Sequence, residues 1–158
     1  MFKFFKKQNA GFLMVEVLVA ASIITASVLA AMAVTQKSIS VSRQSLHTSQ
    51  AAFLLEEGAE AVRILRDNNW TNISGLTAGT TYYPLFTGGT WTLSATANQV
   101  GIFTRTVVLS AVNRNATTGD VGSGSNDAGT RLATVTVSWT EGGTAHSKTL
   151  SFYITDIF

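Results

Sequence analysis

The chain has 158 residues, which is enough for one globular domain with an extension but too few for two full domains. Only 13% of the residues are charged, and Lys3, Lys6 and Lys7 fall near the start, so the rest of the chain is close to neutral. This balance argues against a nucleic-acid-binding surface, and the lack of cysteine excludes disulfides and thiolate metal sites.

The first predicted element is an apolar stretch at residues 12–34, which contains one charged residue, Glu16, and neither proline nor glycine. As an α-helix it would be roughly 35 Å long, enough to cross the roughly 30 Å hydrocarbon core of a membrane. The lysines before it are expected on the cytoplasmic side of the membrane, which places the rest of the chain on the other side.

Two ordinary interpretations of this stretch are a cleaved secretory signal and a simple membrane anchor. The sequence Ala31-Met32-Ala33 fits a signal-peptidase site, but the apolar stretch is longer than the usual ~7–15 residues. A carboxylate inside an apolar helix costs about 2.5–3.5 kcal/mol on insertion into a membrane, so Glu16 is expected to serve a function. Neither interpretation supplies that function.

The residues at the start of the stretch support a third interpretation. The sequence Gly-Phe-Leu-Met-Val-Glu-Val at 11–17, after a short leader that carries lysines, closely resembles the processing signature of type IV prepilins and type II secretion pseudopilins. The resemblance implies that residues 1–11 are a leader peptide, which a membrane peptidase removes after Gly11 before it methylates the new N-terminal residue, Phe12. It also implies an assembly role for Glu16: in a bundle of apolar helices, this carboxylate would neutralise the ammonium of Phe12 in a neighbouring subunit.

Proteins of this kind polymerise through their N-terminal helices. The resemblance therefore implies a structural filament subunit with no enzymatic activity and no cofactor. Its expected partners are homologous pilin subunits, the prepilin peptidase and methylase, the pilus or secretion assembly machinery and the membrane, but not nucleic acid. The expected location is the cytoplasmic membrane, and after assembly an extracellular pilus or a periplasmic pseudopilus. The apolar helix lacks the mid-segment proline or glycine of many major pilins, which favours a minor pilin or a pseudopilin.

The helix is predicted to continue through residues 35–67 with a different character. From residue 51 its apolar positions follow the spacing of one helix face, with most charged residues away from that face. This stripe consists of Ala51, Leu54, Leu55, Gly58, Ala61, Val62 and Leu65. Gly58 is unfavourable within a helix by up to about 1 kcal/mol, so we expect another backbone element to approach it closely. The second half of the helix is thus predicted to pack on a folded domain.

The remainder of the chain is predicted to be a connecting loop at 68–90 followed by an antiparallel sheet at 91–158, so the fold class is α+β. Four strands are expected, at 91–97, 102–112, 133–139 and about 150–154, with a long surface loop at 113–130. A hairpin turn is predicted at Glu-Gly-Gly-Thr 141–144, which would place Val135 opposite Leu150 and Ala133 opposite Phe152.

Residues with other chemistry are few. His47 and His146 have no spaced partners that suggest a zinc site or a catalytic triad, so both are expected on the solvated surface. The glycine-rich loop offers Asp120, Asn126 and Asp127 as oxygen ligands for calcium, but their spacing does not match an EF-hand and a loop without metal is preferred.

The alternative function is a secreted or membrane-anchored β-rich binding module or adhesin that does not polymerise. Its ligand platform would be drawn from Trp70, Trp91 and Trp139. A tryptophan on an alternating strand is more often a core residue than a ligand platform, so this alternative ranks second. An enzyme ranks third, because the sequence shows no convergent set of acid, base and nucleophile.

Overall fold

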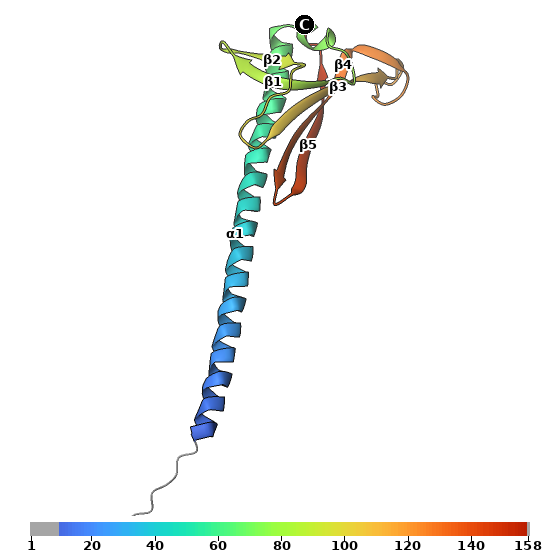
Figure 1. The fold of residues 1–158 in the computed structure, drawn as a ribbon. Coiled ribbons are helices and arrows are strands. Elements are labelled where there is room, and N and C mark those ends of the chain that lie inside the picture. The colour runs from blue at the N-terminus through green and yellow to red at the C-terminus, as the bar shows by residue number, and fades with distance from the viewer. Residues whose placement is uncertain (1–9, 158) are drawn as a thin grey trace, which may run out of the picture. The chain divides into compact units, whose positions relative to one another are not determined.

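The computed structural model describes the backbone of residues 10–157 and the side chains of residues 13–157. The chain forms two compact units, one ending at Ser45 and one beginning at Leu46. A single helix, α1 (Ala10–Asn68), contributes to both, and a short helix α2 (Thr71–Ser74) and five strands complete the second unit (Figure 1). The predicted α+β class is therefore confirmed.

The N-terminal part of α1 is apolar on all sides, and its described side chains are exposed. Its few hydroxyl groups donate hydrogen bonds to backbone carbonyls one turn earlier in the same helix. The four bonds are Ser22 to Leu18 (2.7 Å), Thr25 to Ala21 (2.7 Å), Ser27 to Ile23 (2.8 Å) and Thr35 to Ala31 (2.9 Å). These bonds satisfy the hydroxyls without any partner outside the helix.

Helix α1 ends one residue later than predicted, because side chains just beyond it satisfy the terminal backbone groups. The carbonyl of Leu65, in the last turn of the helix, accepts hydrogen bonds from the backbone N–H of Asn69 (3.2 Å) and from the side-chain amide of Asn72 (3.1 Å). The side-chain oxygen of Asn69 accepts hydrogen bonds from the backbone and the hydroxyl of Thr71 (2.8 and 2.7 Å). This arrangement starts α2, whose Ile73 is fully buried.

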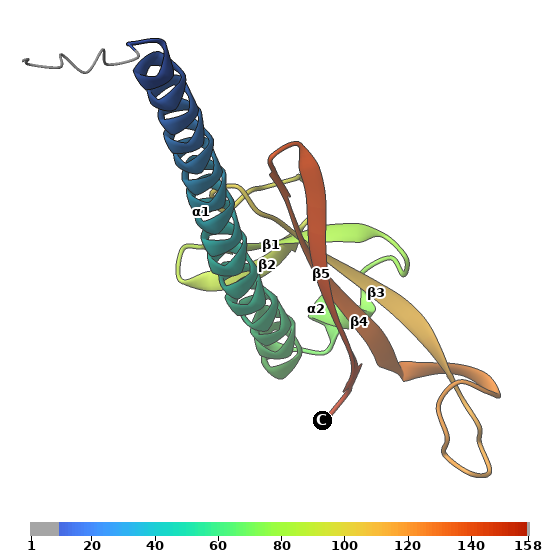
Figure 2. The ribbon, with the colours of Figure 1, turned by 90° about the horizontal axis from the view of Figure 1, so that it is seen from below.

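The five strands form one antiparallel sheet in the order β2-β1-β3-β4-β5 (Figure 2). Their bounds are β1 (Thr81–Thr87), β2 (Thr90–Ser94), β3 (Thr104–Arg114), β4 (Ser125–Glu141) and β5 (Thr144–Thr155). The prediction of four strands was short by one, since residues 68–90 contain α2, β1 and the first residue of β2 rather than a connecting loop. The predicted loop at 113–130 is also shorter, because β4 already begins at Ser125.

Strand β1 was missed because Pro84 lies inside it. Proline lacks a backbone N–H and is normally confined to positions where a strand has a free side. The pairing of β1 with β3 covers only Thr81 and Tyr82, so beyond these residues β1 has a single neighbour, β2. Pro84 pairs with Leu93 of β2 and is itself buried. The proline therefore occupies a position where its missing N–H is tolerated.

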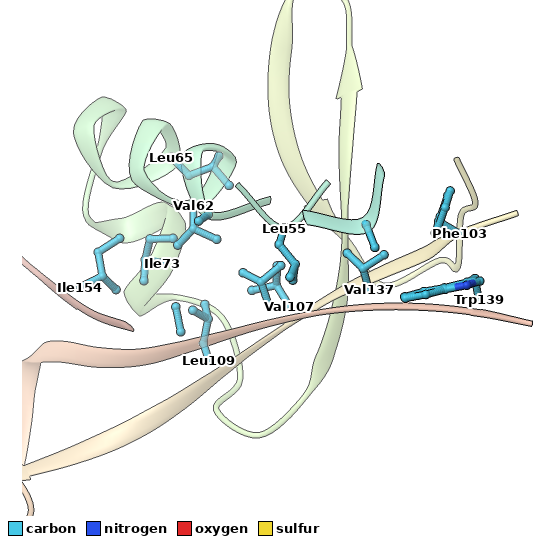
Figure 3. Packing of buried hydrophobic residues seen from close by; sticks show 14 residues of the cluster. Leu55, Val62, Leu65, Ile73, Phe103, Val107, Leu109, Val137, Trp139 and Ile154 are labelled. Atoms are coloured by element: carbon cyan, nitrogen blue, oxygen red, sulfur yellow. The ribbon is translucent and has the colours of Figure 1, made fainter. Parts of the chain in front are cut away.

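The core lies between the predicted stripe of α1 and the inner face of the sheet (Figure 3). The stripe is buried as expected, with Leu54 half-buried. The strands contribute Val107, Leu109, Ala133, Val135, Val137, Trp139 and Ile154, and Phe103 joins them from just before β3. The predicted close approach at Gly58 is confirmed: a Cβ there would lie 2.7 Å from Cγ1 of Val135.

The β4–β5 hairpin follows its prediction in turn and register. Gly142 and Gly143 both have positive φ (56° and 80°), which a tight two-residue turn requires and glycine adopts freely. Val135 pairs with Leu150, and Ala133 pairs with Phe152. The hairpin is longer than predicted, since β5 extends from Thr144 to Thr155.

Candidate functional site

The candidate processing and assembly residues lie at the start of α1. Residues 1–9 of the expected leader lie outside the described part of the chain. Gly11 and Phe12 belong to the helical backbone of α1, and only their backbone is described. Glu16 is described and exposed on the helix, where its neighbours along one side are Val15, Val19 and other aliphatic residues.

The helix that carries Glu16 is long and apolar enough to cross a membrane. None of its most apolar window is buried within the described part of the chain. Among the described residues 13–157, no ion pair involves Glu16. The carboxylate is thus the single charge on an unpacked apolar surface between residues 13 and 34.

His47 does not lie on the solvated surface as predicted. Its Nδ1 is 3.1 Å from Oε2 of Glu141, and the two side chains are only 24% and 20% exposed. The imidazole ring also meets the ring of Phe103 edge to face, with 6.1 Å between centroids. The contact joins α1 to the tip of the β4–β5 hairpin, two segments far apart in sequence, so no local pattern could have revealed it.

His146 is half-buried rather than fully solvated. Its ring stacks on that of Trp139, with centroids 5.5 Å apart and an interplanar angle of 21°. Trp139 in turn packs against Phe103 in the core. Neither histidine belongs to a metal-binding cluster among residues 13–157, where no three histidine, aspartate or glutamate side chains gather closely enough to hold a metal ion.

The three residues weighed for calcium do not converge. Asp127 is held by Arg114, whose Nε donates to its Oδ2 (2.7 Å), and by the hydroxyl of Thr130 (2.7 Å). Asp120 instead accepts a hydrogen bond from the hydroxyl of Thr118 (2.7 Å). Asn126 pairs across the β3–β4 ladder with Asn113. A calcium ion at Asp127 would have to displace the positively charged guanidinium of Arg114 or lie beside it.

The contacts of Asp127 serve the loop itself. The hydrogen bond from Arg114, and then that from Thr130, hold the pKa of the Asp127 carboxyl below its usual value. Arg114 also donates from Nη1 to the carbonyl of Gly119 (2.8 Å), which ties the loop to the ends of β3 and β4. We therefore assign Asp127 to loop anchoring.

Sequence reasoning missed Arg105, which is only 3% exposed on the inner face of β3. Its Nη1 lies 2.8 Å from Oε2 of Glu57 and 3.5 Å from the carbonyl of Leu54, both on α1. Its guanidinium also sits 5.3 Å from the ring centroid of Trp91. A signal was present, since Arg105 alternates with Val107 on the buried face and so had to point inward.

The tryptophans give little support to a ligand platform. Trp139 is 5% exposed and belongs to the core. Trp70 and Trp91 are half-buried and pack against the same core. All three side chains thus have a structural role.

No family model, curated protein or solved structure matches the chain. Its function must therefore be inferred from its own residues and their geometry.

Proposed function

We propose that the chain is a structural subunit of a type IV pilus or a related filament, polymerised through its N-terminal helix. It enters the membrane as a prepilin, is cleaved after Gly11 and is N-methylated at Phe12. The observation that carries the proposal is a combination of three features. No described residue packs on the apolar part of the helix, this part carries one carboxylate at Glu16, and the same helix continues into the core of the second unit. A membrane anchor alone would need the first of these features but not the second.

The exposed apolar surface sets a strong requirement for a covering environment. Between residues 13 and 34 the large apolar side chains that are more than half exposed are Leu13, Met14, Val15, Val17, Leu18, Val19, Ile23, Ile24, Val28, Leu29, Met32 and Val34. Full burial of such a side chain contributes about 1.5–3 kcal/mol, and these side chains are 52–70% exposed, so leaving them in water would cost on the order of 10–25 kcal/mol. Lipid can cover them in the membrane. Outside the membrane, the apolar helices of other copies in a polymer can cover them in the same way.

Apolar surface alone does not select one arrangement of helices, because lipid and neighbouring aliphatic side chains are similar solvents. Glu16 supplies the selectivity in this proposal. Its burial costs about 2.5–3.5 kcal/mol unless a cation compensates it, and cleavage after Gly11 creates such a cation at Phe12 of another copy. Only arrangements that bring the two groups together avoid the penalty, so the pair sets the axial register.

Within this class a minor pilin or a pseudopilin is favoured over a major pilin. Residues 12–57 contain neither proline nor glycine, and α1 is continuous from Ala10 to Asn68. The helix therefore has no built-in point at which it would melt during assembly. The partners of this function are other pilin subunits, the prepilin peptidase and methylase, the assembly machinery and the membrane, in which the subunit resides before assembly into a pilus or pseudopilus.

The experiment that tests the proposal is mass spectrometry of the mature N-terminus, on chain purified from host membranes and from sheared surface material. The proposal requires a chain that begins at N-methylated Phe12. A surface pilus would also place it in the sheared fraction, whereas a periplasmic pseudopilus would keep it with the cells. A chain that begins at Val34 would show cleavage by signal peptidase after Ala33 and would refute it. A chain that keeps residues 1–11 and stays in the membrane would instead identify an anchored binding module.

A further inference from the structure

The second unit carries an exposed apolar groove that its own fold does not fill. The groove has a volume of about 490 Å³ and lies between α1 and the loop that joins β2 to β3. Its walls include Phe53 and Gln50 on the helix and Val100 and Ile102 on the loop. Phe53 is 71% exposed and Ile102 49%, which is unusual for neighbouring large apolar side chains on a soluble surface.

The loop wall of the groove is held in place by the backbone. Val100 and Phe103 exchange two hydrogen bonds (2.9 and 3.1 Å), which close a tight turn over Gly101 and Ile102. Gly101 has a φ of 62°, which a side chain would disfavour. Phe103 is 5% exposed and packs on Trp139, so the turn is anchored in the core. The groove is therefore formed before any partner binds.

The chemistry of the walls restricts what the groove can accept. Among the described residues that line the groove, only His47 is titratable, and its Nδ1 faces Glu141 within the same unit. The walls thus offer no free charge for an ionic partner, and they favour an uncharged apolar one. Residues 17–34 of this chain match that requirement: they contain no charged residue, and their alanines let another surface approach the helix closely.

We propose that this groove on one copy binds the apolar helix of a second copy, at residues 17–34. The inference rests on the proposed function and adds to it a specific docking site, formed by Phe53 together with the Val100–Ile102 turn. The second copy is the favoured occupant for two reasons. Both surfaces are uncharged and apolar, and the exposed helix must be covered once it leaves lipid.

Disulfide mapping tests the proposal directly, because the chain has no cysteine of its own. Two differently tagged full-length copies are co-expressed in the host. One carries Ile102→Cys and the other carries a single cysteine at successive positions from 17 to 34. The matched control places the first cysteine at Thr136, whose hydroxyl lies 3.1 Å from that of Thr149 on the face of the sheet away from the core. Sheared material is oxidised mildly and the linked heterodimers are quantified.

The expected result is linkage to Ile102→Cys at positions that recur every three to four residues, at least tenfold above the Thr136→Cys control. Linkage no greater than in the control at every position would overturn the proposal. So would linkage of Ile102→Cys only to itself, which would show that two grooves face each other. The mass of the mature N-terminus separates failure of this inference from failure of the proposed function. Methylated Phe12 in sheared polymers without periodic linkage would refute the docking site alone, whereas a chain that begins at Val34 would refute the proposed function.

Discussion

Replacing Gly58 with alanine sets two known effects against each other at the contact between α1 and the sheet. Alanine favours the helix over glycine by up to about 1 kcal/mol. Its Cβ, however, would lie 2.7 Å from Cγ1 of Val135 and 3.1 Å from Cδ of Arg105. Val135 is fully buried in β4, which has a paired strand on each side, so it has little room to move.

Overpacking of a close-packed core costs about 1–3 kcal/mol, and the rigid position of Val135 argues for the upper part of this range. After the gain in helix propensity is subtracted, we expect Gly58→Ala to lower the free energy of unfolding by about 1–2 kcal/mol. The assay is urea unfolding of the full-length chain in detergent, followed by tryptophan fluorescence. Trp139 is buried in the same core, so its emission reports this unit.

A second substitution, at Val135, tests whether the effect of Gly58→Ala comes from the contact between these two residues. Val135→Ala removes the two γ-methyl groups, so the added methyl of Gly58→Ala then has space. The double variant should be more stable than the sum of the two single effects predicts, by about 1–2 kcal/mol. If Gly58→Ala stabilises the otherwise unchanged chain by about 1 kcal/mol, helix propensity dominates and the close approach has no energetic weight.

Three further predictions concern charged groups. Glu16→Ala should leave membrane insertion and the mature N-terminus unchanged but reduce the amount of chain in sheared material at least tenfold; normal incorporation would exclude its role in register. Glu57→Gln should lower the free energy of unfolding by about 1–3 kcal/mol, because it leaves the buried guanidinium of Arg105 without its anion. The control Glu56→Gln, at an exposed residue of the same helix, should change the free energy of unfolding by less than about 0.5 kcal/mol. The pKa of Asp127 in the folded state lies below its unfolded value of about 3.9, so the stabilisation by this carboxylate is present above pH 3.9 and is lost as the pH falls through the folded-state pKa. The difference in unfolding midpoint between the wild type and Asp127→Asn should therefore shrink as the pH is lowered through this range. A difference that stays constant down to low pH would contradict this.

Patterns that act within one element were read correctly from the sequence. Helix α1 was predicted to within one residue at its C-terminal end, because apolar periodicity and the absence of breakers operate along the helix itself. The close approach at Gly58 was also predictable. Glycine is unfavourable in a helix, so its presence on the buried stripe indicates a neighbour that lies too close for any side chain. The hairpin turn at Gly142 and Gly143 also followed from local conformational preference.

Features that depend on where distant segments meet were not predictable. The pairs His47–Glu141 and Arg105–Glu57 each join α1 to the sheet, and a single sequence does not show which residues a helix face will meet. Pro84 shows a different limit, since a residue that usually argues against a strand is accepted where a strand has one neighbour. The assembly role of Glu16 is a prediction of another kind, because its test requires a second copy of the chain.

The hydroxyl groups of Ser22, Thr25, Ser27 and Thr35 have a consequence for exchange between environments. Each one donates to its own helix, so it needs no partner from lipid, from detergent or from another chain. Moving the helix between these surroundings neither breaks nor forms hydrogen bonds at these positions, so these four hydroxyl groups add no barrier to the transfer. The same property makes the helix surface nearly featureless along its length. In the proposed filament, loss of the Glu16 charge should therefore let neighbouring helices slide past each other more readily than it lets them separate.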